Sequence, residues 1–191
     1  MKLKVNDIFY SLQGEGVNTG MAVVFVRLAG CNRRCNFCDT DFDAFREMSV
    51  DEVIAEARSV AGDSNCRRLI LTGGEPAMQI DKSLIDALHK QGYKVAIETN
   101  GSLPLPGGID WITVSPKGET VLTECDELKC VFIDATTVSD HGIEARHYCL
   151  QPCDVGDEES NKRITAACID YIKKHPKWRL SLQMHKIAGF K

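Results

Sequence analysis

The sequence predicts an α/β protein whose core is a partial, incomplete TIM-like barrel of about six strands and about three helices, roughly (β6/α3). Two observations predict the class. Short apolar runs rich in β-branched residues recur along the chain, and helical repeats alternate with the first of them. A third observation predicts that the barrel is incomplete, because a closed (β/α)₈ barrel typically needs about 250 residues. This chain has 191 residues.

The strands are predicted from runs of apolar residues. Residues 22–29 form a nearly continuous run, which is typical of a strand buried on both faces of a parallel sheet. Similar runs predict strands at residues 68–72, 94–98, 111–114, 128–133, 147–151 and 178–183, and residues 8–12 could add a short extra strand. In barrels of this class the chemistry lies at the C-terminal ends of the strands, so functional residues are expected directly after each run.

Three helices are predicted. Ser49 and Glu52 form a capping box, and apolar residues then repeat at helical spacing up to about residue 61. A second helix, marked by residues 84–88, is expected to stop at Gly92, and a third, marked by residues 164–172, to end before Pro176. Residues 101–108 hold two prolines and three glycines where the next helix of a βαβ repeat would lie. The later crossovers are expected to be loops or elements too short to predict.

Composition and charge limit the functional classes. The chain is 43% hydrophobic and 26% charged, which excludes intrinsic disorder and fits a single domain over residues 1–191. Its 23 Lys and Arg against 27 Asp and Glu give a net charge of −4 without a basic block, which argues against a nucleic-acid partner. The charged first residues and the lack of a long apolar run argue against a signal peptide and a membrane span, so we expect a cytoplasmic protein.

The nine cysteines are therefore interpreted as small buried side chains together with a metal or redox site, because disulfides are rare in a reducing compartment. Cys31, Cys35 and Cys38 follow the first buried strand with the spacing C-x3-C-x2-C. A cubane iron–sulfur cluster ordinarily takes four thiolates, so three ligands would leave one iron open to an outside ligand. The cysteines alone favour this cluster over a zinc site completed by Cys125/Cys130 or Cys149/Cys153, or over three unrelated thiols.

Three further strand ends carry residues that suit a ligand. Residues 71–76 read Leu-Thr-Gly-Gly-Glu-Pro after one strand, and residues 98–101 and 115–117 place Glu, Asn, Ser and Lys after the next two. Paired glycines let the backbone approach a ligand closely. Gly-Gly-Glu-Pro by itself is more often a tight turn, but its position after the cysteine motif favours a ligand site.

With the C-x3-C-x2-C motif followed by Gly-Gly-Glu-Pro, the chain resembles the radical S-adenosylmethionine (SAM) superfamily. The resemblance implies a radical SAM core with a [4Fe-4S] cluster on Cys31, Cys35 and Cys38, whose fourth iron is chelated by the amino and carboxylate groups of SAM. One electron from the cluster would cleave SAM to a 5′-deoxyadenosyl radical that abstracts hydrogen from the substrate.

Within the superfamily the chain looks like a member of the 7-carboxy-7-deazaguanine synthase family of the 7-deazapurine (queuosine) pathway. The resemblance rests on residues 9–16, 25–31, 38–40, 115–117, 150–154 and 182–186 and covers almost the whole chain. It implies a carbon–nitrogen lyase that converts 6-carboxy-5,6,7,8-tetrahydropterin into 7-carboxy-7-deazaguanine with loss of ammonia. It also implies Mg²⁺, a flavodoxin-like or ferredoxin-like electron donor and a homodimer. The rival functions are a glycyl-radical-enzyme activase and a non-enzymatic zinc or iron–sulfur module.

Arg27 is the one charge in the buried run at residues 22–29, and a lone buried guanidinium is costly unless it is paired. From the residues alone a structural salt bridge inside the barrel is slightly favoured, whereas the resemblance favours the substrate carboxylate as the partner. Gln13 and Glu15 lie in a glycine-flanked segment and carry the amide and carboxylate that could bind a pterin edge, although the segment could equally be a simple turn.

The remaining site residues are assigned by the resemblance. Thr40 would bind Mg²⁺, and no catalytic residue is expected beyond the cluster and its bound SAM. Substrate contacts are implied for Leu12, Gln13, Gly14, Glu15, Arg27, Thr72, His185 and Lys191, the last through its side chain or its backbone. SAM contacts are implied for Phe37, Cys38, Asp39, Gly74, Ser115, Pro116, Lys117, Gln151, Pro152, Cys153 and Asp154. Core or surface thiols are expected at Cys66, Cys125, Cys130, Cys149 and Cys168.

Overall fold

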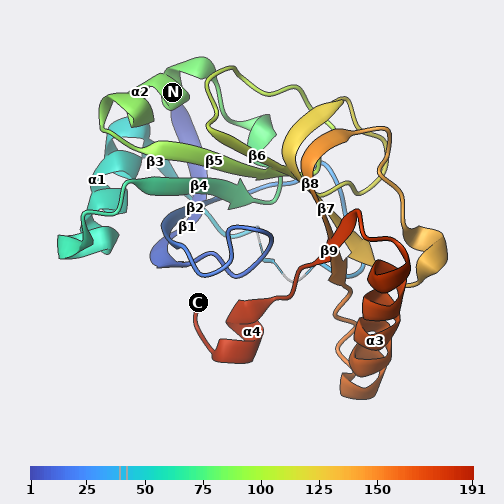
Figure 1. The fold of residues 1–191 in the computed structure, drawn as a ribbon. Coiled ribbons are helices and arrows are strands. Elements are labelled where there is room, and N and C mark those ends of the chain that lie inside the picture. Colours follow the sequence, from blue (N-terminus) through green and yellow to red (C-terminus); the bar gives the residue numbers. More distant parts are fainter. Residues whose placement is uncertain (39, 42) are drawn as a thin grey trace.

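The computed structural model describes residues 1–38, 40–41 and 43–191. Its centre is a nine-stranded sheet in the order β3-β1-β2-β4-β5-β6-β7-β8-β9 (Figure 1). The strands are β1 (Lys2–Leu12), β2 (Ala22–Leu28), β3 (Arg46–Ser49), β4 (Arg68–Gly73), β5 (Lys94–Thr99), β6 (Trp111–Val114), β7 (Glu124–Phe132), β8 (Glu144–Pro152) and β9 (Trp178–Leu180).

The sheet is an open, partial barrel, as predicted. Every pairing from β2 through β4, β5, β6, β7 and β8 to β9 is parallel, whereas β1 pairs antiparallel with β2 and β3 antiparallel with β1. No pairing between the two edge strands, β3 and β9, closes the barrel within the described part of the chain. The C-terminal ends of the parallel strands β2 and β4 to β9 lie at one edge of the sheet, which is the mouth of the barrel.

The strands predicted at residues 22–29, 68–72, 94–98 and 111–114 match β2, β4, β5 and β6 to within one residue, whereas β7 and β8 begin four and three residues earlier than predicted. The expected short strand at residues 8–12 is the end of the eleven-residue β1, and β3 was not predicted. β9 ends at Leu180 instead of residue 183. Edge strands hydrogen-bond on one side only and bury fewer side chains, so their apolar patterns are weaker.

The helices are α1 (Val50–Ala61), α2 (Lys82–Lys90), α3 (Glu158–Lys174) and the short α4 (Met184–Ala188), of which α4 was not predicted. Ser49 and Glu52 form the predicted capping box of α1, and Asp81 caps α2 through the backbone N–H of Leu84. α3 begins earlier than its apolar repeat because Asp157 caps it and acidic residues fill its first turn. Short 3₁₀ turns lie at Gly62–Ser64, Pro76–Met78 and Ala135–Thr137.

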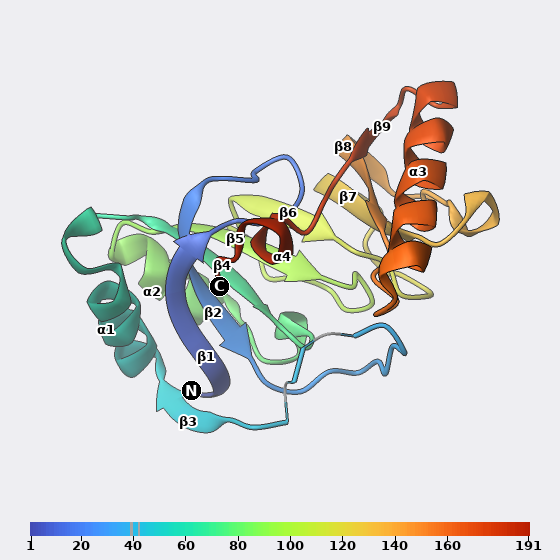
Figure 2. The ribbon, with the colours of Figure 1, turned by 90° about the horizontal axis from the view of Figure 1, so that it is seen from below.

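Two clusters of buried side chains hold the outer face of the sheet. One packs α1 and α2 against β1, β2, β4 and β5, with Val53, Leu84 and Leu88 fully buried. The other packs α3 against β7, β8 and β9 through Cys168 and its half-buried neighbours Tyr171 and Ile172. Figure 2 shows these two groups of helices on separate parts of the sheet. The connection from β5 to β6 carries no helix, as the prolines and glycines of residues 101–108 predicted, and the connection from β6 to β7 carries none either.

The opposite, inner face of the sheet is apolar at one end and polar at the other. Phe25 and Ile70 lie in a small inner cluster against which Phe9 packs, with the rings of Phe9 and Phe25 stacked at 4.9 Å. Because side chains two residues apart share a face of a strand, Arg27 follows Phe25 and Thr72 follows Ile70 toward the mouth. Arg27 and Thr72 are neighbours in the register of β2 and β4. The strand period thus carries functional side chains to the C-terminal ends of the strands.

No helix in the described residues is both long enough and apolar enough to cross a membrane.

Candidate active site

The loop that carries Cys31, Cys35 and Cys38, the cysteine loop, lies at the mouth of the barrel directly after β2. It is tied to the end of β5, because Asn100 Nδ2 donates to Asn32 Oδ1 over 2.9 Å and Asn32 Nδ2 donates to Ser102 Oγ over 2.8 Å. Within the loop, the N–H of Cys38 donates to the carbonyl oxygen of Cys35 over 3.1 Å. The start of the motif is thus fixed to the end of β5 through Asn32.

The Gly-Gly-Glu-Pro segment passes very close to the cysteine loop. A Cβ atom on Gly74 would lie 2.0 Å from the carbonyl oxygen of Gly30 and 2.9 Å from Cβ of Cys31, so only glycine fits there. Glu75 is fully buried, and its carboxylate accepts hydrogen bonds from Thr99 Oγ1 and from the N–H of Asn100, each over 2.7 Å. A buried carboxylate requires such partners. Glu75 therefore holds the end of β5 beside the segment and is not free to bind a ligand with its side chain.

A cavity of about 470 Å³ opens between the cysteine loop and the ends of β4 to β8, a volume that suits a small-molecule cofactor. Nine of the eleven residues that the resemblance assigns to SAM line it, together with Cys31 and Cys35. Those nine are Phe37, Cys38, Gly74, Ser115, Lys117, Gln151, Pro152, Cys153 and Asp154. Pro116 is buried and does not line the cavity, and Asp39 lies outside the described residues.

Lys117 and Asp154 lie on this cavity in different electrostatic settings. Burial and the nearby Lys129 lower the pKa of the Lys117 ammonium, whose Nζ donates to the carbonyl oxygen of Ser115 over 3.2 Å. The Asp154 carboxylate accepts from Lys186 Nζ over 2.7 Å and from Asn161 Nδ2 over 2.7 Å, and these bonds, that to Lys186 first, hold its pKa well below its usual range. A ligand hydroxyl at Asp154 would share this carboxylate with Lys186.

A second cavity, of about 540 Å³, lies on the inner face beside the first. All eight residues that the resemblance assigns to the substrate line it: Leu12, Gln13, Gly14, Glu15, Arg27, Thr72, His185 and Lys191. They come from the end of β1, from β2 and β4, and from the C-terminal segment. Residues that span the length of the sequence thus meet around one space of ligand size.

Arg27 is half-buried in this second cavity, and its Nη1 donates to Thr40 Oγ1 over 3.2 Å. The structural salt bridge considered from the residues alone is absent, since no carboxylate among the described residues pairs with Arg27. Thr40 lines both cavities. The guanidinium therefore faces the cavity with donors available for an anion.

The C-terminal segment closes one side of the second cavity. The N–H of Met184 donates to the carbonyl oxygen of Gly14 over 2.9 Å, and a Cβ atom on Gly14 would lie 2.6 Å from Nδ1 of His185. At the chain end, a main-chain oxygen of Lys191 accepts from Ser11 Oγ over 2.6 Å, and Lys191 Nζ pairs with Asp7 over 2.6 Å. Lys191 Nζ also lies 4.6 Å from the centre of the ring of Phe9, which lines the same cavity.

The two cavities adjoin, because Glu15, Thr40, Thr72 and Glu98 line both. Glu98 and Lys129 were not assigned to the site from the sequence. Lys129 interrupts the apolar run at residues 128–133, which is the same signal that identified Arg27 in its own strand. Glu98 was noticed at a strand end, but nothing in the sequence said that its side chain points inward.

The residues of the cysteine loop fit an iron–sulfur cluster. Cys31, Cys35 and Cys38 line the same cavity, and burial raises the pKa of the Cys31 thiol. No three His, Cys, Asp or Glu side chains of the described residues converge on one point as ligands of a single ion do. A cubane does not require convergence, because each thiolate binds a different iron.

The other cysteines differ from these three. Cys66, Cys130, Cys149, Cys153 and Cys168 are buried and Cys125 is half-buried, and all nine cysteines of the chain are free thiols. Burial raises the pKa of Cys125, Cys130 and Cys149 to about 12, so these thiols stay protonated at neutral pH. They have the character of core side chains.

Comparison with known proteins agrees with this site. Residues 25–134 match the model of the radical SAM superfamily. The chain is 47% identical to a 7-carboxy-7-deazaguanine synthase of Bacteroides thetaiotaomicron over 193 aligned positions and 40% identical to one of Bradyrhizobium diazoefficiens over 215, with all of each chain covered. The crystal structure of QueE from Escherichia coli superposes with a TM-score of 0.71 at 28% identity, covering 97% of this chain and 95% of that one. The chain is therefore a radical SAM enzyme that belongs to the 7-carboxy-7-deazaguanine synthase family.

Proposed function

We propose that the chain converts 6-carboxy-5,6,7,8-tetrahydropterin into 7-carboxy-7-deazaguanine and ammonia. One observation carries the proposal: nine residues assigned to SAM line one cavity, all those assigned to the substrate line a second, and the two cavities adjoin at shared residues that include Glu15, Thr40, Thr72 and Glu98. A reaction in which a group derived from one ligand removes a hydrogen atom from another needs two such sites in contact. The name shared by the relatives supports the same product.

Cys31, Cys35 and Cys38 would hold the [4Fe-4S] cluster. With SAM on its open iron, the cluster supplies the electron that generates a 5′-deoxyadenosyl radical, which removes hydrogen from the substrate. The close approach of Gly74 to Gly30 supports a role of the glycines in leaving room for SAM. Lys117, whose ammonium is largely buried, suits the carboxylate of SAM.

Arg27 would bind the substrate carboxylate, because it is the cation on the second cavity that no described carboxylate neutralises. Thr40 would bind Mg²⁺ beside it. A hard cation that keeps much of its hydration needs few protein ligands, and the Thr40 hydroxyl faces the space shared by both cavities. The substrate carboxylate and the Mg²⁺ ion would then lie next to each other.

The polar ring of the pterin would lie against Gln13 and Glu15. The amide of Gln13 donates through Nε2 to Glu98 Oε1 over 3.0 Å, and its Oε1 accepts from the N–H of Glu15 over 3.2 Å. These bonds support a fixed orientation of the polar groups before the substrate arrives. His185 and the backbone of Lys191 would cover the ring from the side of the C-terminal segment.

The domain organisation, the location in the cell, the electron donor and the oligomeric state are also proposed. The sheet that runs from Lys2 to Leu180 supports a single domain. Nine unpaired cysteines suit the cytoplasm. The electron would come from a separate flavodoxin-like or ferredoxin-like protein, and we propose that the enzyme works as a homodimer.

Anaerobic reconstitution tests the proposal. The protein is loaded with iron and sulfide, mixed with SAM, Mg²⁺, a reductant and 6-carboxytetrahydropterin, and the products are analysed by mass spectrometry. We expect 7-carboxy-7-deazaguanine with recovery of SAM, and no product from the variant Cys35→Ser. A fully loaded cluster that cleaves SAM but yields no deazapurine would refute the proposed substrate.

A further inference from the structure

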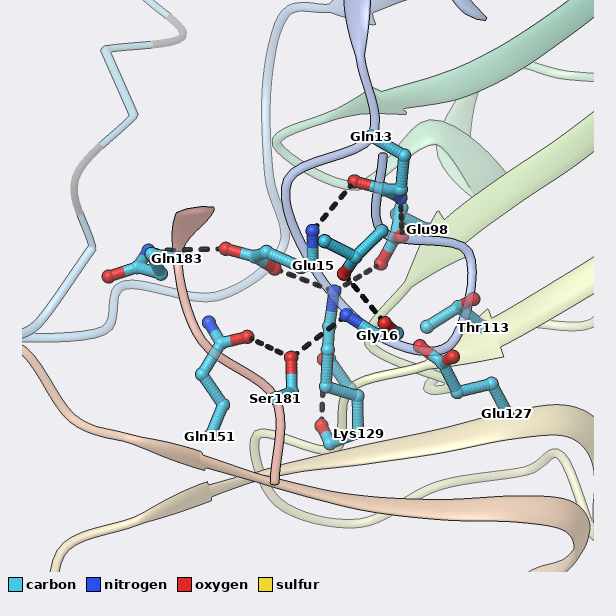
Figure 3. A network of polar contacts seen from close by, with 12 residues as sticks. Gln13, Glu15, Gly16, Glu98, Thr113, Glu127, Lys129, Gln151, Ser181 and Gln183 are labelled. Atoms are coloured by element: carbon cyan, nitrogen blue, oxygen red, sulfur yellow. Dashed lines mark hydrogen bonds and ion pairs between the residues drawn. The ribbon is translucent and has the colours of Figure 1, made fainter. Parts of the chain in front are cut away.

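Lys129 lies in the interior of the barrel with 6% of its side chain exposed, and the proposed function leaves it without a role. It is placed on the inner face of β7 between the polar ends of the neighbouring strands. Its Nζ lies 2.7 Å from Glu15 Oε2 and 2.9 Å from Glu98 Oε2 (Figure 3). One ammonium therefore bridges two carboxylates from segments far apart in the sequence.

The second oxygens of the two carboxylates are also engaged. Glu15 Oε1 accepts from Gln183 Nε2 over 3.2 Å, and Glu98 Oε1 accepts from Gln13 Nε2 over 3.0 Å. Lys129 is thus the centre of a network that joins the segment after β1, the end of β5 and the segment before α4. Each of these three places contributes a lining residue to the second cavity.

More carboxylates than ammonium groups surround Lys129. Three carboxylates, those of Glu15, Glu98 and Glu127, act on this one ammonium, and they raise its pKa against the opposing effect of burial. Burial would raise the pKa of Glu15, but Lys129 lowers it to about 2. The Glu127 carboxylate, which accepts from the N–H of Val17 over 2.7 Å, has a pKa raised by burial. At neutral pH the ammonium of Lys129 and the carboxylate of Glu15 are both charged.

Three other titratable groups lie near this cluster. Lys117, after β6, has a pKa lowered by burial and by Lys129. Cys149 lies opposite Lys129 in the register of β7 and β8, and burial raises its thiol pKa to about 12. His147 lies opposite Glu127 and stacks on Trp111. Of the groups facing the carboxylates of Glu15 and Glu98, Lys129 is the one cation that hydrogen-bonds to both among the described residues.

We infer that Lys129 is a positioning residue for the substrate: its ammonium holds the carboxylates of Glu15 and Glu98 side by side, so that both accept hydrogen bonds from the N–H groups of the pterin ring. Glu15 and Glu98 line both cavities, whereas Lys129 lines only the first. Lys129 therefore acts through the two carboxylates and does not touch the substrate. The inference rests on the proposed function, because it assumes a ligand rich in N–H donors.

Replacing Lys129 by Met, which has a similar shape, leaves the half-buried Glu15 and Glu98 side by side without their shared cation. Without a cation between them the carboxylates of Glu15 and Glu98 repel each other, so Glu15 takes up a proton or moves away. We expect KM for the pterin to rise by at least about tenfold at pH 7, the loss typical of hydrogen bonds to a charged acceptor. The value of kcat should change less, because the cysteine loop is not part of the network.

The pH profile separates positioning from a merely structural role. With Lys129 present, Glu15 is ionised throughout the neutral range, so KM should be nearly constant between about pH 6 and pH 8.5. Without Lys129 the pKa of Glu15 rises, so its carboxylate is protonated at the low end of that range and ionises as pH increases. KM of Lys129→Met should therefore fall as pH rises, whereas a general loosening of the fold would raise KM equally at every pH.

The experiment compares the reconstituted wild type with Lys129→Met, Lys129→Arg and the control Lys162→Met. Lys162 is exposed on α3, where it pairs with Glu158 over 2.6 Å. Steady-state KM and kcat are measured across the pH range, and equilibrium binding of the pterin is followed by calorimetry. Iron content and thermal unfolding are measured for each variant. Arginine keeps the positive charge, so Lys129→Arg should restore a KM that does not depend on pH.

A folded Lys129→Met with wild-type KM, or with a KM raised equally at all pH values, would overturn the inference. If Lys129→Met does not fold, Glu98→Gln is compared with Glu98→Gln/Lys129→Met, which buries one carboxylate fewer. The single variant keeps the pair of Lys129 and Glu15, so only the double variant should have a KM that falls with rising pH, and identical profiles would refute the inference. A wild type that binds no pterin would instead refute the proposed function.

Discussion

The guanidinium of Arg27 donates a hydrogen bond through Nη1 to Oγ1 of Thr40 over 3.2 Å. The two residues lie thirteen positions apart, on either side of the cysteine loop. A substrate carboxylate at Arg27 and a metal ion at Thr40 would therefore be neighbours, and the two functions can be tested separately by substitution.

The first prediction concerns Arg27. Arg27→Ala should raise KM for the pterin by at least about tenfold, because a charge-assisted pair with the substrate carboxylate is lost. Iron content and the binding of SAM should not change, since Arg27 does not line the cofactor cavity. The control is Arg146→Ala, which removes an exposed arginine paired with Asp126 over 2.9 Å. An unchanged KM in Arg27→Ala would exclude this role.

Thr40 provides the second prediction. Thr40→Val keeps the shape of the side chain but removes the oxygen ligand, so product formation should lose its dependence on added Mg²⁺ and remain at the level seen after chelation. Thr40→Ser should retain the dependence. Rates are titrated with Mg²⁺ beside the exposed control Thr123→Val. A Thr40→Val variant stimulated as strongly as the wild type would show that Thr40 is not the ligand.

The third prediction separates the cysteines. Reconstituted wild type should bind about four iron atoms per chain, as one cubane requires. Cys35→Ser should lose most of this iron and the visible absorption of the cluster, whereas Cys125→Ser should keep both. Iron analysis and absorption spectra decide the outcome, and equal iron in the two variants would contradict the assignment of the cluster to the C-x3-C-x2-C loop.

A fourth prediction follows from the contact between Gly14 and His185. Gly14→Ala would place Cβ 2.6 Å from Nδ1 and 3.2 Å from the backbone nitrogen of His185, so His185 must move and KM for the pterin should rise. Overpacking of this kind costs about 1–3 kcal/mol of stability. The matched control is Gly107→Ala, because no atom lies within 4 Å of a Cβ at Gly107. If both variants have the wild-type KM and unfolding temperature, the close contact does not position the C-terminal segment.

The fifth prediction concerns the loss of the free energy of unfolding at acid pH. The pKa of Glu15 is lowered from its ordinary 4.5 to about 2 in the folded protein, with Lys129 overcoming the effect of burial. A carboxyl group with a lowered pKa stabilises the fold above its unfolded pKa, and this stability is lost as pH falls through the folded value. The free energy of unfolding should therefore fall less steeply below about pH 4.5 in Glu15→Gln than in wild type. Denaturant unfolding at a series of pH values measures this, with the exposed Glu119→Gln as control, and parallel curves would argue against the pair.

Some parts of the fold were predictable because the decisive interactions are local. The capping box at Ser49 and Glu52 and the stop before Gly92 depend on residues within one turn of a helix, and both are present. The β3 strand and the α4 helix are short and have few buried side chains, so their patterns were too weak to predict. Their formation depends on pairing with β1 and on packing against Gly14, which no local pattern encodes.

The sequence by itself determined the chemistry of this protein: a loop of three thiols, a glycine pair and a lone arginine in an apolar strand are recognisable from residue types and spacing. Only the tertiary structure decided that Glu15, Glu98 and Lys129 meet in one buried cluster, and that SAM-assigned and substrate-assigned residues line separate, adjoining cavities. The physical reason is that a parallel sheet gathers the ends of strands that are distant in the chain. Which charge is paired with which depends on the curvature and register of that sheet, and these are set by packing over the whole molecule.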